Sequence, residues 1–421
     1  MGMFRTFSLG LFAVLAAVLY APVAHVIRVG GIFRTPQQMF FPEGHGPIHI
    51  EDTIHCEDVH HYRPANLLFA ACEDSKMTRI GWFPPLDHFS KLPTTPGSIH
   101  VIDPKTMKSK RLAFDGFKGP FVSHGIDVIE DPKQADAVYI VAVNHLPNPE
   151  YYEQEAEAAE AQNIPKARSQ IEIFRHVLQS NKAQHVRSIR HPLIRTPNDV
   201  VADSPYSLYV TNDHFYREGT LRLIEDLWPS AKWSNIIHVQ IDELKSTDAL
   251  AGVQASVAHT GLWNNNGLGH GQSEQEVVIS SAVGGELYIA NKYDNNSTLS
   301  IHSTISFDTV TDNPSYYADP YRTDSDDASG YLVAGISQPV NLAENSKDPE
   351  AKDPCQAWYA RRAGDGKWEK KMLFEDDGSR LRTASAAVLV PIEPKEDGKK
   401  RAWLFVTGFM SESMVAVQVE L

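Results

Sequence analysis

The stretch TPNDVVADSPYSLYVTNDH, Thr196 to His214, decides how the rest of this chain is interpreted. It begins with the polar pair Asn198-Asp199, continues through an apolar strand pattern, and ends with Asn212-Asp213-His214. Oxygen-bearing side chains at the entry and exit of a strand suit a hard cation such as calcium. Asn and Asp are also ordinary turn residues. Which interpretation holds depends on whether similar strands and similar polar pairs recur elsewhere in the chain.

The strand pattern of this stretch does recur. Two or three apolar or aromatic residues are followed by a small residue and then by Asn, Gly or Cys. The instances are Leu67–Cys72, Tyr139–Asn144, Leu208–Asn212, Leu287–Asn291, Tyr331–Gly335 and Leu404–Gly408. Between them lie strands whose residues alternate with a period of two, such as Ser98–Asp103 and Ile236–Ile241. Six instances predict six repeats of short strands, which indicates an all-β, six-bladed β-propeller.

The spacing of these repeats requires two insertions that we expect over the top face of the propeller. One runs from Pro147 to Arg168 and contains the helical run Tyr152–Ala161. The other, residues 216–229, places Leu221, Ile224, Leu227 and Trp228 at helical spacing. This second helix could pack on the propeller top, or it could be a lid or a membrane-facing helix.

Composition bounds the class of protein. The chain has 421 residues, of which 42% are hydrophobic and 22% charged, and this is typical of a globular protein. Its net charge of -14 argues against a nucleic-acid partner, because phosphate backbones need a basic face.

The N-terminus predicts the secretory pathway. Phe7 to Ile27 is a nearly uncharged run that could be a signal anchor or a cleaved signal peptide. The division expected is residues 1–28 as signal sequence or anchor, 29–50 as linker, and 51–421 as the propeller. Two overlapping sequons make Asn295 and Asn296 candidate glycosylation sites and fit a membrane-anchored or extracellular location.

The three cysteines, Cys56, Cys72 and Cys355, allow one disulfide, and none has zinc-type spacing. In a secreted protein, Cys72–Cys355 is a plausible bridge. Cys56 would then be a small buried apolar residue rather than a nucleophile.

Within a propeller the polar pairs become informative, because the inner strands of the blades converge on a central tunnel. Three pairs stand out, Glu57-Asp58, Asn198-Asp199 and Asp312-Asn313, together with the run Asn264–Gly267. Neighbouring residues on an extended strand point to opposite sides, so one pair can serve two sites. The tunnel could therefore hold two stacked calcium ions.

At this point the chain resembles the serum paraoxonase/arylesterase family of calcium-dependent six-bladed propellers, from about Cys56 to Leu421. The motifs that carry the resemblance are Cys56-Glu-Asp58, Ser123-His-Gly-Ile126, Val143-Asn-His145, Ile189-Arg-His191, Pro197-Asn-Asp199, Thr211-Asn-Asp-His214, Asn266-Gly-Leu268 and Thr311-Asp-Asn313. The chain departs from the family at its C-terminus, Val417–Leu421, which lacks the family's cysteine. Closure of the ring must then depend on strand pairing or on another bridge.

The resemblance implies two calcium ions per chain. A catalytic ion would be held by Glu57, Asn198, Asn266, Asp312 and Asn313. A structural ion would be held by Asp58, Asp199 and the backbone carbonyl of Ile126.

It also implies that the substrates are lactones and aryl esters. Calcium would polarise the carbonyl and stabilise the oxyanion. His124 would activate water with support from His145, and His214 would line the pocket. Lipid or membrane association through the N-terminal helix and residues 216–229 is a further expectation. Two alternatives remain open, a non-catalytic calcium-stabilised propeller that binds a partner and a single-metal gluconolactonase-like hydrolase.

Overall fold

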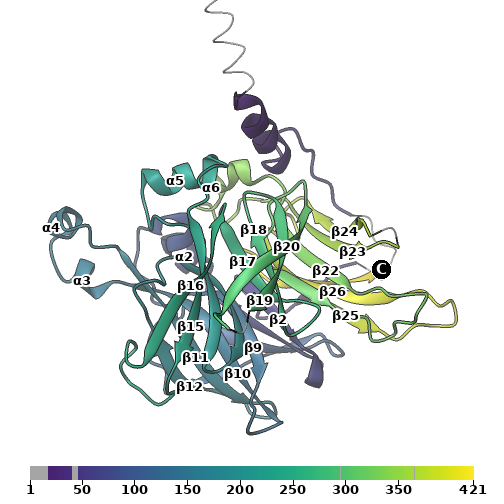
Figure 1. Ribbon diagram of the computed structural model, residues 1–421, viewed down its shortest axis with the longest axis horizontal. Helices are drawn as coiled ribbons and strands as arrows, with labels where there is room; N and C mark the ends of the chain where they lie inside the picture. Colours follow the sequence, from purple (N-terminus) through teal and green to yellow (C-terminus); the bar gives the residue numbers. More distant parts are fainter. Residues whose placement is uncertain (1–17, 40–45, 294, 365) are drawn as a thin grey trace, which may run out of the picture.

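The strands form a ring of six sheets around a central axis in the computed structural model, which describes residues 18–39, 46–293, 295–364 and 366–421 (Figure 1). The inner strands are β2 (Cys56–Tyr62), β9 (Ser123–Glu130), β13 (Pro197–Ser204), β17 (Asn265–His270), β21 (Pro314–Tyr317) and β25 (Ala384–Ile392). Each contacts the inner strand of the blades on both sides, which closes the ring. The predicted six-bladed β-propeller is therefore confirmed.

Outside the inner strands, each blade adds further antiparallel strands. Blade 1 adds β3 (Leu67–Cys72), β6 (Ser98–Asp103) and β7 (Lys108–Arg111), and blade 2 adds β10 (Ala137–Pro147), β11 (Ala167–Val177), β12 (Lys182–Ile189) and a parallel edge strand β8 (Ala113–Asp115). Blade 3 adds β14 (Ser207–Asn212), β15 (Ser234–Ile241) and β16 (Val253–Leu262), and blade 4 adds β18 (Glu276–Ser281), β19 (Glu286–Tyr293) and β20 (Thr298–Ser306). Blade 5 adds β22 (Gly330–Ile336), β23 (Cys355–Arg362) and β24 (Trp368–Asp376), and blade 6 adds β26 (Arg401–Gly408), β27 (Met414–Glu420) and β1 (Ile48–Ile50).

The recurring sequence pattern marks the second strand in five of the six blades. In blade 4 the second strand is β18, and Leu287–Asn291 lies in the third strand, β19. The apolar side chains of these strands gather in clusters between neighbouring blades. One such cluster joins Phe69 and Val101 of blade 1 to Ile126 and Val138 of blade 2. Burial on both faces of each sheet explains why the second strands are nearly continuous apolar runs.

Strand pairing between the two ends of the chain closes the ring. β1 adds to the outer edge of blade 6, where Ile48 faces Ala416 and Ile50 faces Met414 across β27. Ile50 is fully buried among residues of blades 6 and 1. The propeller thus includes Ile48–Ile50, which lies ahead of the expected boundary at residue 51.

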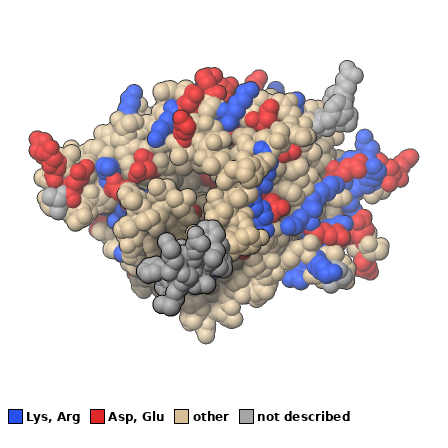
Figure 2. Space-filling model, turned by 90° about the horizontal axis from the view of Figure 1, so that it is seen from above, with Lys and Arg blue, Asp and Glu red and all other residues tan. Residues whose placement is uncertain are grey.

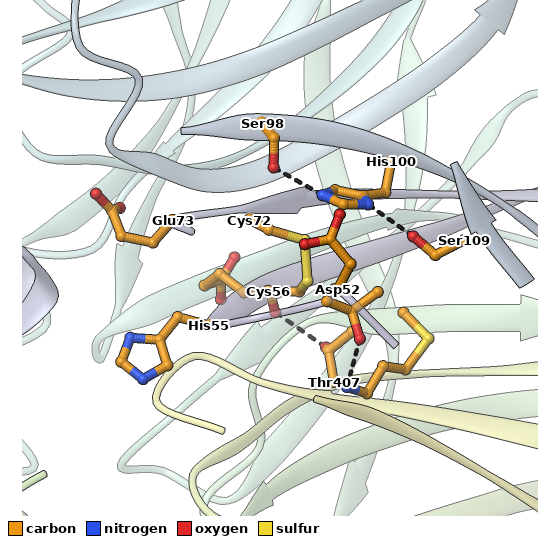
Figure 3. The surroundings of a disulfide bond; sticks show 12 residues. Asp52, His55, Cys56, Cys72, Glu73, Ser98, His100, Ser109 and Thr407 are labelled. Atoms are coloured by element: carbon orange, nitrogen blue, oxygen red, sulfur yellow. Dashed lines mark hydrogen bonds between the residues drawn. A yellow bond between two sulfur atoms is a disulfide. The ribbon is translucent and has the colours of Figure 1, made fainter. Parts of the chain in front are cut away.

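The expected Cys72–Cys355 bridge is wrong. Cys56 forms the disulfide with Cys72, its direct partner across the β2–β3 hairpin (Figure 3). Cys355 is a free, buried thiol on β23. Blade 6 separates blade 5, which carries Cys355, from blade 1, so no cross-ring bridge forms. Cys56 is buried as expected, but in a disulfide within one hairpin rather than as a free apolar residue.

The N-terminal segment ends against the propeller. Residues 18–29 are helical; His25 Nε2 lies 2.8 Å from the carbonyl of Val283, its ring lies 5.0 Å from that of Trp263, and Val29 is buried. Residues 7–17 of the predicted signal or anchor lie outside the described residues. Among the helices that the structure describes, none is long and apolar enough to cross a bilayer.

Both expected insertions carry helices. α3 (Pro149–Tyr152) and α4 (Ala156–Ala161) project from the side of the propeller, whereas α5 (Thr220–Leu227) lies on top beside α6 (Leu342–Asn345) (Figure 1). Seen from above, acidic side chains gather at the left edge, on the side where α3 and α4 project (Figure 2).

The α5 helix has an unusual orientation for a helix that covers a propeller. Its polar residues Arg222 and Glu225 are buried, and Leu223, Leu227 and the following Trp228 are exposed. The helix therefore attaches through polar contacts and presents its apolar stripe to the outside.

Candidate active site

The polar pairs lie where the inner strands bend. The regular pairing of β2 with β3 is interrupted at Glu57, that of β13 with β14 at Asn198-Asp199, and that of β17 with β18 at Asn266-Gly267. Such irregularities are common near active sites, because an unpaired residue re-aims its side chain. These interruptions leave Glu57, Asn198-Asp199 and Asn266 outside the regular strand pairing, and Asp312-Asn313 comes directly before β21.

Two glycines allow these strands to approach one another closely. A Cβ on Gly125 would lie 1.9 Å from Asp199 Oδ1, and a Cβ on Gly267 would lie 2.5 Å from the Cα of Asn313. Only glycine leaves room for these contacts. Residues far apart in sequence therefore meet in the tunnel.

Five buried oxygens in this tunnel have no hydrogen-bond partner among the residues that the structure describes. They are Glu57 Oε2, Asn198 Oδ1, Asn266 Oδ1, Asp312 Oδ1 and Asn313 Oδ1. Buried polar atoms are nearly always satisfied in native proteins, so such a set requires an explanation such as a bound ion. Carboxylate and amide oxygens are the ligands that calcium prefers. The donor set therefore fits a hard cation.

Buried negative charge favours the same interpretation. Burial, followed by the charges of Asp312, Asp58 and Asp199, raises the pKa of Glu57 well above the usual carboxyl range. Burial and the charges of Asp58 and Asp213 likewise raise the pKa of Asp312. Asn313 Nδ2 donates to Glu57 Oε1 at 2.9 Å but carries no charge. Among the described residues, no three His, Cys, Asp or Glu side chains group as a metal site, so a cation here depends on the Asn amides.

The second predicted set differs in its hydrogen bonding. Asp58 accepts from the backbone N–H groups of Ile126 and Val59, at 2.9 and 2.7 Å. Asp199 accepts from those of Leu268 and Val200, both at 2.7 Å. Burial raises the pKa of Asp58 to about 6 despite these hydrogen bonds. The structure brings Asp58, Asp199 and Ile126 together, but their carboxylates are already satisfied by backbone donors.

The two predicted catalytic histidines form a hydrogen-bonded pair. His124 Nδ1 lies 2.9 Å from His145 Nε2, and His145 Nδ1 lies 2.7 Å from Ser169 Oγ. His124 Nε2 faces Glu57 Oε1 at 3.8 Å. Burial, aided by His145 and Arg79, lowers the pKa of His124 well below its ordinary value, and burial lowers that of His145 to about 3. Both rings are therefore neutral near pH 7, as a general base requires.

Phe83 and Arg79 pack beneath the His124–His145 pair. The ring of Phe83 lies 5.2 Å from that of His124 and 5.9 Å from that of His145, both edge-on. The guanidinium of Arg79, fully buried, lies 4.2 Å from the Phe83 centroid and 3.7 Å from Glu73 Oε2. The sequence interpretation missed Arg79, Phe83 and Ser169, because a single Arg, Phe or Ser carries no spacing signal.

His214 lies in the same region but is not free. Its Nδ1 lies 3.1 Å from Asp213 Oδ1, and its Nε2 lies 2.7 Å from Asp226 Oδ1 on α5. Burial and Arg222 act to lower its pKa, but the two carboxylates outweigh them and raise it to about 9. Asn212, left unassigned by the sequence, satisfies the backbone N–H groups of Arg195 and Thr196. The role of His214 as a pocket-lining group stays a prediction.

A cavity lies on the Asp58 side of the tunnel. It has a volume of about 270 Å³ and is lined by residues from all six inner strands, including Asp58 and Ile126. Asp127 at its wall is held by His60 Nδ1 at 3.1 Å and His270 Nε2 at 2.9 Å. Its carboxylate also accepts backbone N–H groups from Val128 and Ala202. Both carboxylate oxygens of Asp127 thus have partners, and these contacts stabilise the inner strands.

The sequence matches a family model described as arylesterase over residues 81–388, which is well over half of the chain. The chain belongs to the arylesterase family. The recognition made from the sequence motifs is thus confirmed.

Curated relatives agree at modest identity. Chicken (Gallus gallus) serum paraoxonase/arylesterase 2 is 27% identical over 235 residues, 55% of this chain and 56% of that protein. Dog (Canis lupus familiaris) serum paraoxonase/arylesterase 2 is 25% identical over 256 residues, 60% of each chain. Rabbit (Oryctolagus cuniculus) serum paraoxonase/lactonase 3 is 24% identical over 309 residues, 72% of this chain and 74% of that protein. The match to the first two spans little more than half of their length.

Proposed function

We propose that this arylesterase-family protein hydrolyses lactones and aryl esters at the tunnel mouth, with a calcium ion bound by Glu57, Asn198, Asn266, Asp312 and Asn313. The observation that carries the proposal is the set of five unpartnered buried oxygens beside the hydrogen-bonded pair His124–His145. The names of the relatives, paraoxonase/arylesterase and paraoxonase/lactonase, support this substrate class.

When bound, calcium would supply Lewis-acid polarisation of the substrate carbonyl and stabilisation of the oxyanion. The proton transfer is carried by the protein. We assign the tautomers so that His124 Nδ1–H donates to His145 Nε2 and His145 Nδ1–H donates to Ser169, which leaves His124 Nε2 unprotonated. His124 Nε2 then takes a proton from the attacking water, and His145 shares the resulting charge. Phe83 against both rings keeps bulk water away from them.

A second ion at Asp58, Asp199 and the Ile126 carbonyl is part of the same proposal. Burial raises the pKa of both carboxyl groups, and the charge of Asp58 raises that of Asp199 further, so a cation bound here would relieve uncompensated negative charge. Their complete hydrogen bonding to backbone N–H groups is equally compatible with a single ion, as in the gluconolactonase-like alternative. Counting bound calcium per chain separates one ion from two.

The test is hydrolysis of phenyl acetate and of a simple lactone by the purified protein with and without a chelator. We expect chelation to abolish turnover and calcium to restore it. Asn266→Ala should lose calcium affinity by calorimetry and at least about 100-fold in turnover, the usual scale for a lost oxyanion-stabilising group. Asn291→Ala, an exposed Asn on β19, is the matched control and should behave as wild type. Full turnover in chelator would contradict the proposal. Calcium-dependent stability with no hydrolysis would favour the non-catalytic alternative.

Passage through the secretory pathway is proposed with the function. The Cys56–Cys72 disulfide supports an oxidising compartment. Asn295 and Asn296 are exposed beside β20, where a glycan has room. The outward apolar stripe of α5 supports contact with a lipid surface. Whether residues 1–28 are cleaved or remain as an anchor is decided by N-terminal sequencing of the mature protein.

A further inference from the structure

A small pocket reaches the dyad from the side. It has a volume of about 20 Å³ and is lined by His145 and Ser169 together with three arginines, Arg195, Arg217 and Arg222. This space holds one small polar group rather than a whole ester. It is thus a candidate subsite next to the reacting centre.

One of the three arginines is already neutralised. Arg222 is buried, and its guanidinium donates to Asp213 Oδ2 at 3.2 Å and to the carbonyl of Pro85 at 2.9 Å. Asp213 is the acidic residue in the pocket lining, and it is also engaged by His214. The pocket therefore offers no carboxylate to the other two arginines.

Arg195 and Arg217 are both exposed where they line this pocket. The Arg195 guanidinium lies 4.6 Å from the centroid of the Phe215 ring, and Arg217 Nε donates to the Arg195 carbonyl at 3.2 Å. Neither makes an ion pair with a carboxylate in the part of the chain that the structure describes. Glu218, the acid nearest to Arg217 in sequence, pairs with Lys166 at 3.1 Å. Burial and, after it, the charge of Arg195 lower the pKa of Arg217, whereas Glu218 raises it.

Two unpaired guanidinium groups beside an active site are informative in a chain whose net charge is -14. Arg195 lies over the Phe215 ring, a contact that uses none of its N–H donors. Guanidinium forks match carboxylates in geometry and bind them through paired, charge-assisted hydrogen bonds.

We propose that Arg195 and Arg217 bind a carboxylate group carried by the substrate, so that the preferred esters or lactones are anionic. This rests on the proposed hydrolase function and refines its substrate class. The carboxylate would occupy the arginine pocket while the scissile carbonyl lies toward His124. A neutral substrate would leave both arginines without a partner.

The test compares two aryl esters that differ only in charge, 4-acetoxybenzoate and its methyl ester. Wild-type protein should show a lower KM for the charged ester, and added salt should weaken that preference. Arg195→Gln and Arg217→Gln should each raise KM for the charged ester about fivefold to tenfold, within the range of a charge-assisted contact. Both variants should leave the methyl ester unchanged within about twofold.

Arg190→Gln is the matched control, because it removes the same charge from a residue that does not line the pocket. If Arg190→Gln raises KM for the charged ester by as much, the effect comes from the overall electrostatic field of the protein, and the proposal is overturned. A wild-type preference for the methyl ester would also overturn it. If the arginine variants only relieve inhibition by the product acetate, the pocket holds product, and the substrate proposal fails.

The failure of the hydrolase function can be told apart from the failure of this proposal. If wild-type protein hydrolyses neither ester, calorimetry with 4-hydroxybenzoate and its methyl ester still measures anion binding. Tighter binding of the anion that is lost in both arginine variants, but kept in Arg190→Gln, supports the pocket without any turnover. Equal binding of the two compounds contradicts it.

Discussion

Glu57 shows how one buried side chain can require a bound cation. It is buried, its Oε2 has no partner, and the neighbouring charges of Asp312, Asp58 and Asp199 repel its own. A buried charge without compensation costs several kcal/mol, so such a group is either protonated or neutralised by a bound ion. An ion that binds only the folded chain also stabilises the fold. Cation affinity and stability are therefore coupled at this residue.

His214 joins the propeller to α5 through a charge pair, which makes its contribution pH-dependent. Its pKa rises from 6.5 to about 9 between Asp213 and Asp226. Because the folded pKa lies above the unfolded value, the stability it contributes is complete below about pH 6.5 and is lost as the pH rises through about 9. We expect His214→Gln to lose at most about 3 kcal/mol near pH 6 and much less near pH 9.5. Urea unfolding of both proteins at the two pH values measures the gap, which is the difference in the free energy of unfolding between wild type and variant.

Comparison with wild type removes the contribution of every other titrating group. His238→Gln is a suitable control, because burial lowers the pKa of that histidine, whose Nε2 lies 2.9 Å from Ser207 Oγ. The gap for this variant should not close toward high pH. If the difference in the free energy of unfolding for His214→Gln stays constant between the two pH values, the fold does not raise the pKa of His214.

At the scale of single strands, β9 depends on a glycine that no other residue can replace. A Cβ at Gly125 would lie 1.9 Å from Asp199 Oδ1 and 2.7 Å from its Cα, in the neighbouring strand β13. Overpacking of this kind costs about 1–3 kcal/mol. We expect Gly125→Ala to lose this much stability in urea and to bind calcium more weakly, because Asp199 must move. Gly119→Ala, whose Cβ would meet only Phe117 at 3.7 Å, is the control. Unchanged calcium affinity in Gly125→Ala would count against a role for Asp199.

The burial of individual strands explains which predictions from the sequence succeeded. The apolar pattern found five of the six second strands, because burial between blades demands continuous apolar residues there. It selected β19 instead of β18 in blade 4, because Glu276–Ser281 and Leu287–Asn291 are both buried apolar strands. Sequence alternation and burial therefore do not distinguish the second strand of a blade from the third.

From residue patterns alone, the candidate site was predictable only where polar residues come in adjacent pairs, and His124, His145 and Asn266 were assigned through the family resemblance. The pairs Asn198-Asp199 and Asp312-Asn313 are visible in the sequence. Among the described residues, Oδ1 of Asn198, of Asp312 and of Asn313 has no hydrogen-bond partner. Arg195, Arg217 and Ser169 come from separate strands and loops, and only the fold brings them to His145. The Cys56–Cys72 pairing depended on the register of one hairpin, which the cysteine count does not contain.

The whole molecule is a ring, and the three residues of β1 add a strand pairing between its N-terminal edge and blade 6. β1 pairs with β27 as the outer strand of blade 6, and the described residues contain no disulfide that spans the ring, since Cys56–Cys72 lies within blade 1. Every blade packs on two neighbours, so the loss of one contact exposes apolar surface on both sides. Unfolding should therefore be a single cooperative transition.

Ile50 is the residue that tests this closure. It is fully buried in the cluster between blades 6 and 1, whereas Ile48 in the same strand is 37% exposed. We expect Ile50→Ala to lose about 2–5 kcal/mol, the usual cost of truncating a buried isoleucine, and Ile48→Ala to lose under about 1 kcal/mol. Urea unfolding followed by tryptophan fluorescence and by far-ultraviolet circular dichroism should give coincident transitions in both variants. If the two probes separate in Ile50→Ala, blade 6 opens before the rest of the ring, and β1 closes the propeller only locally.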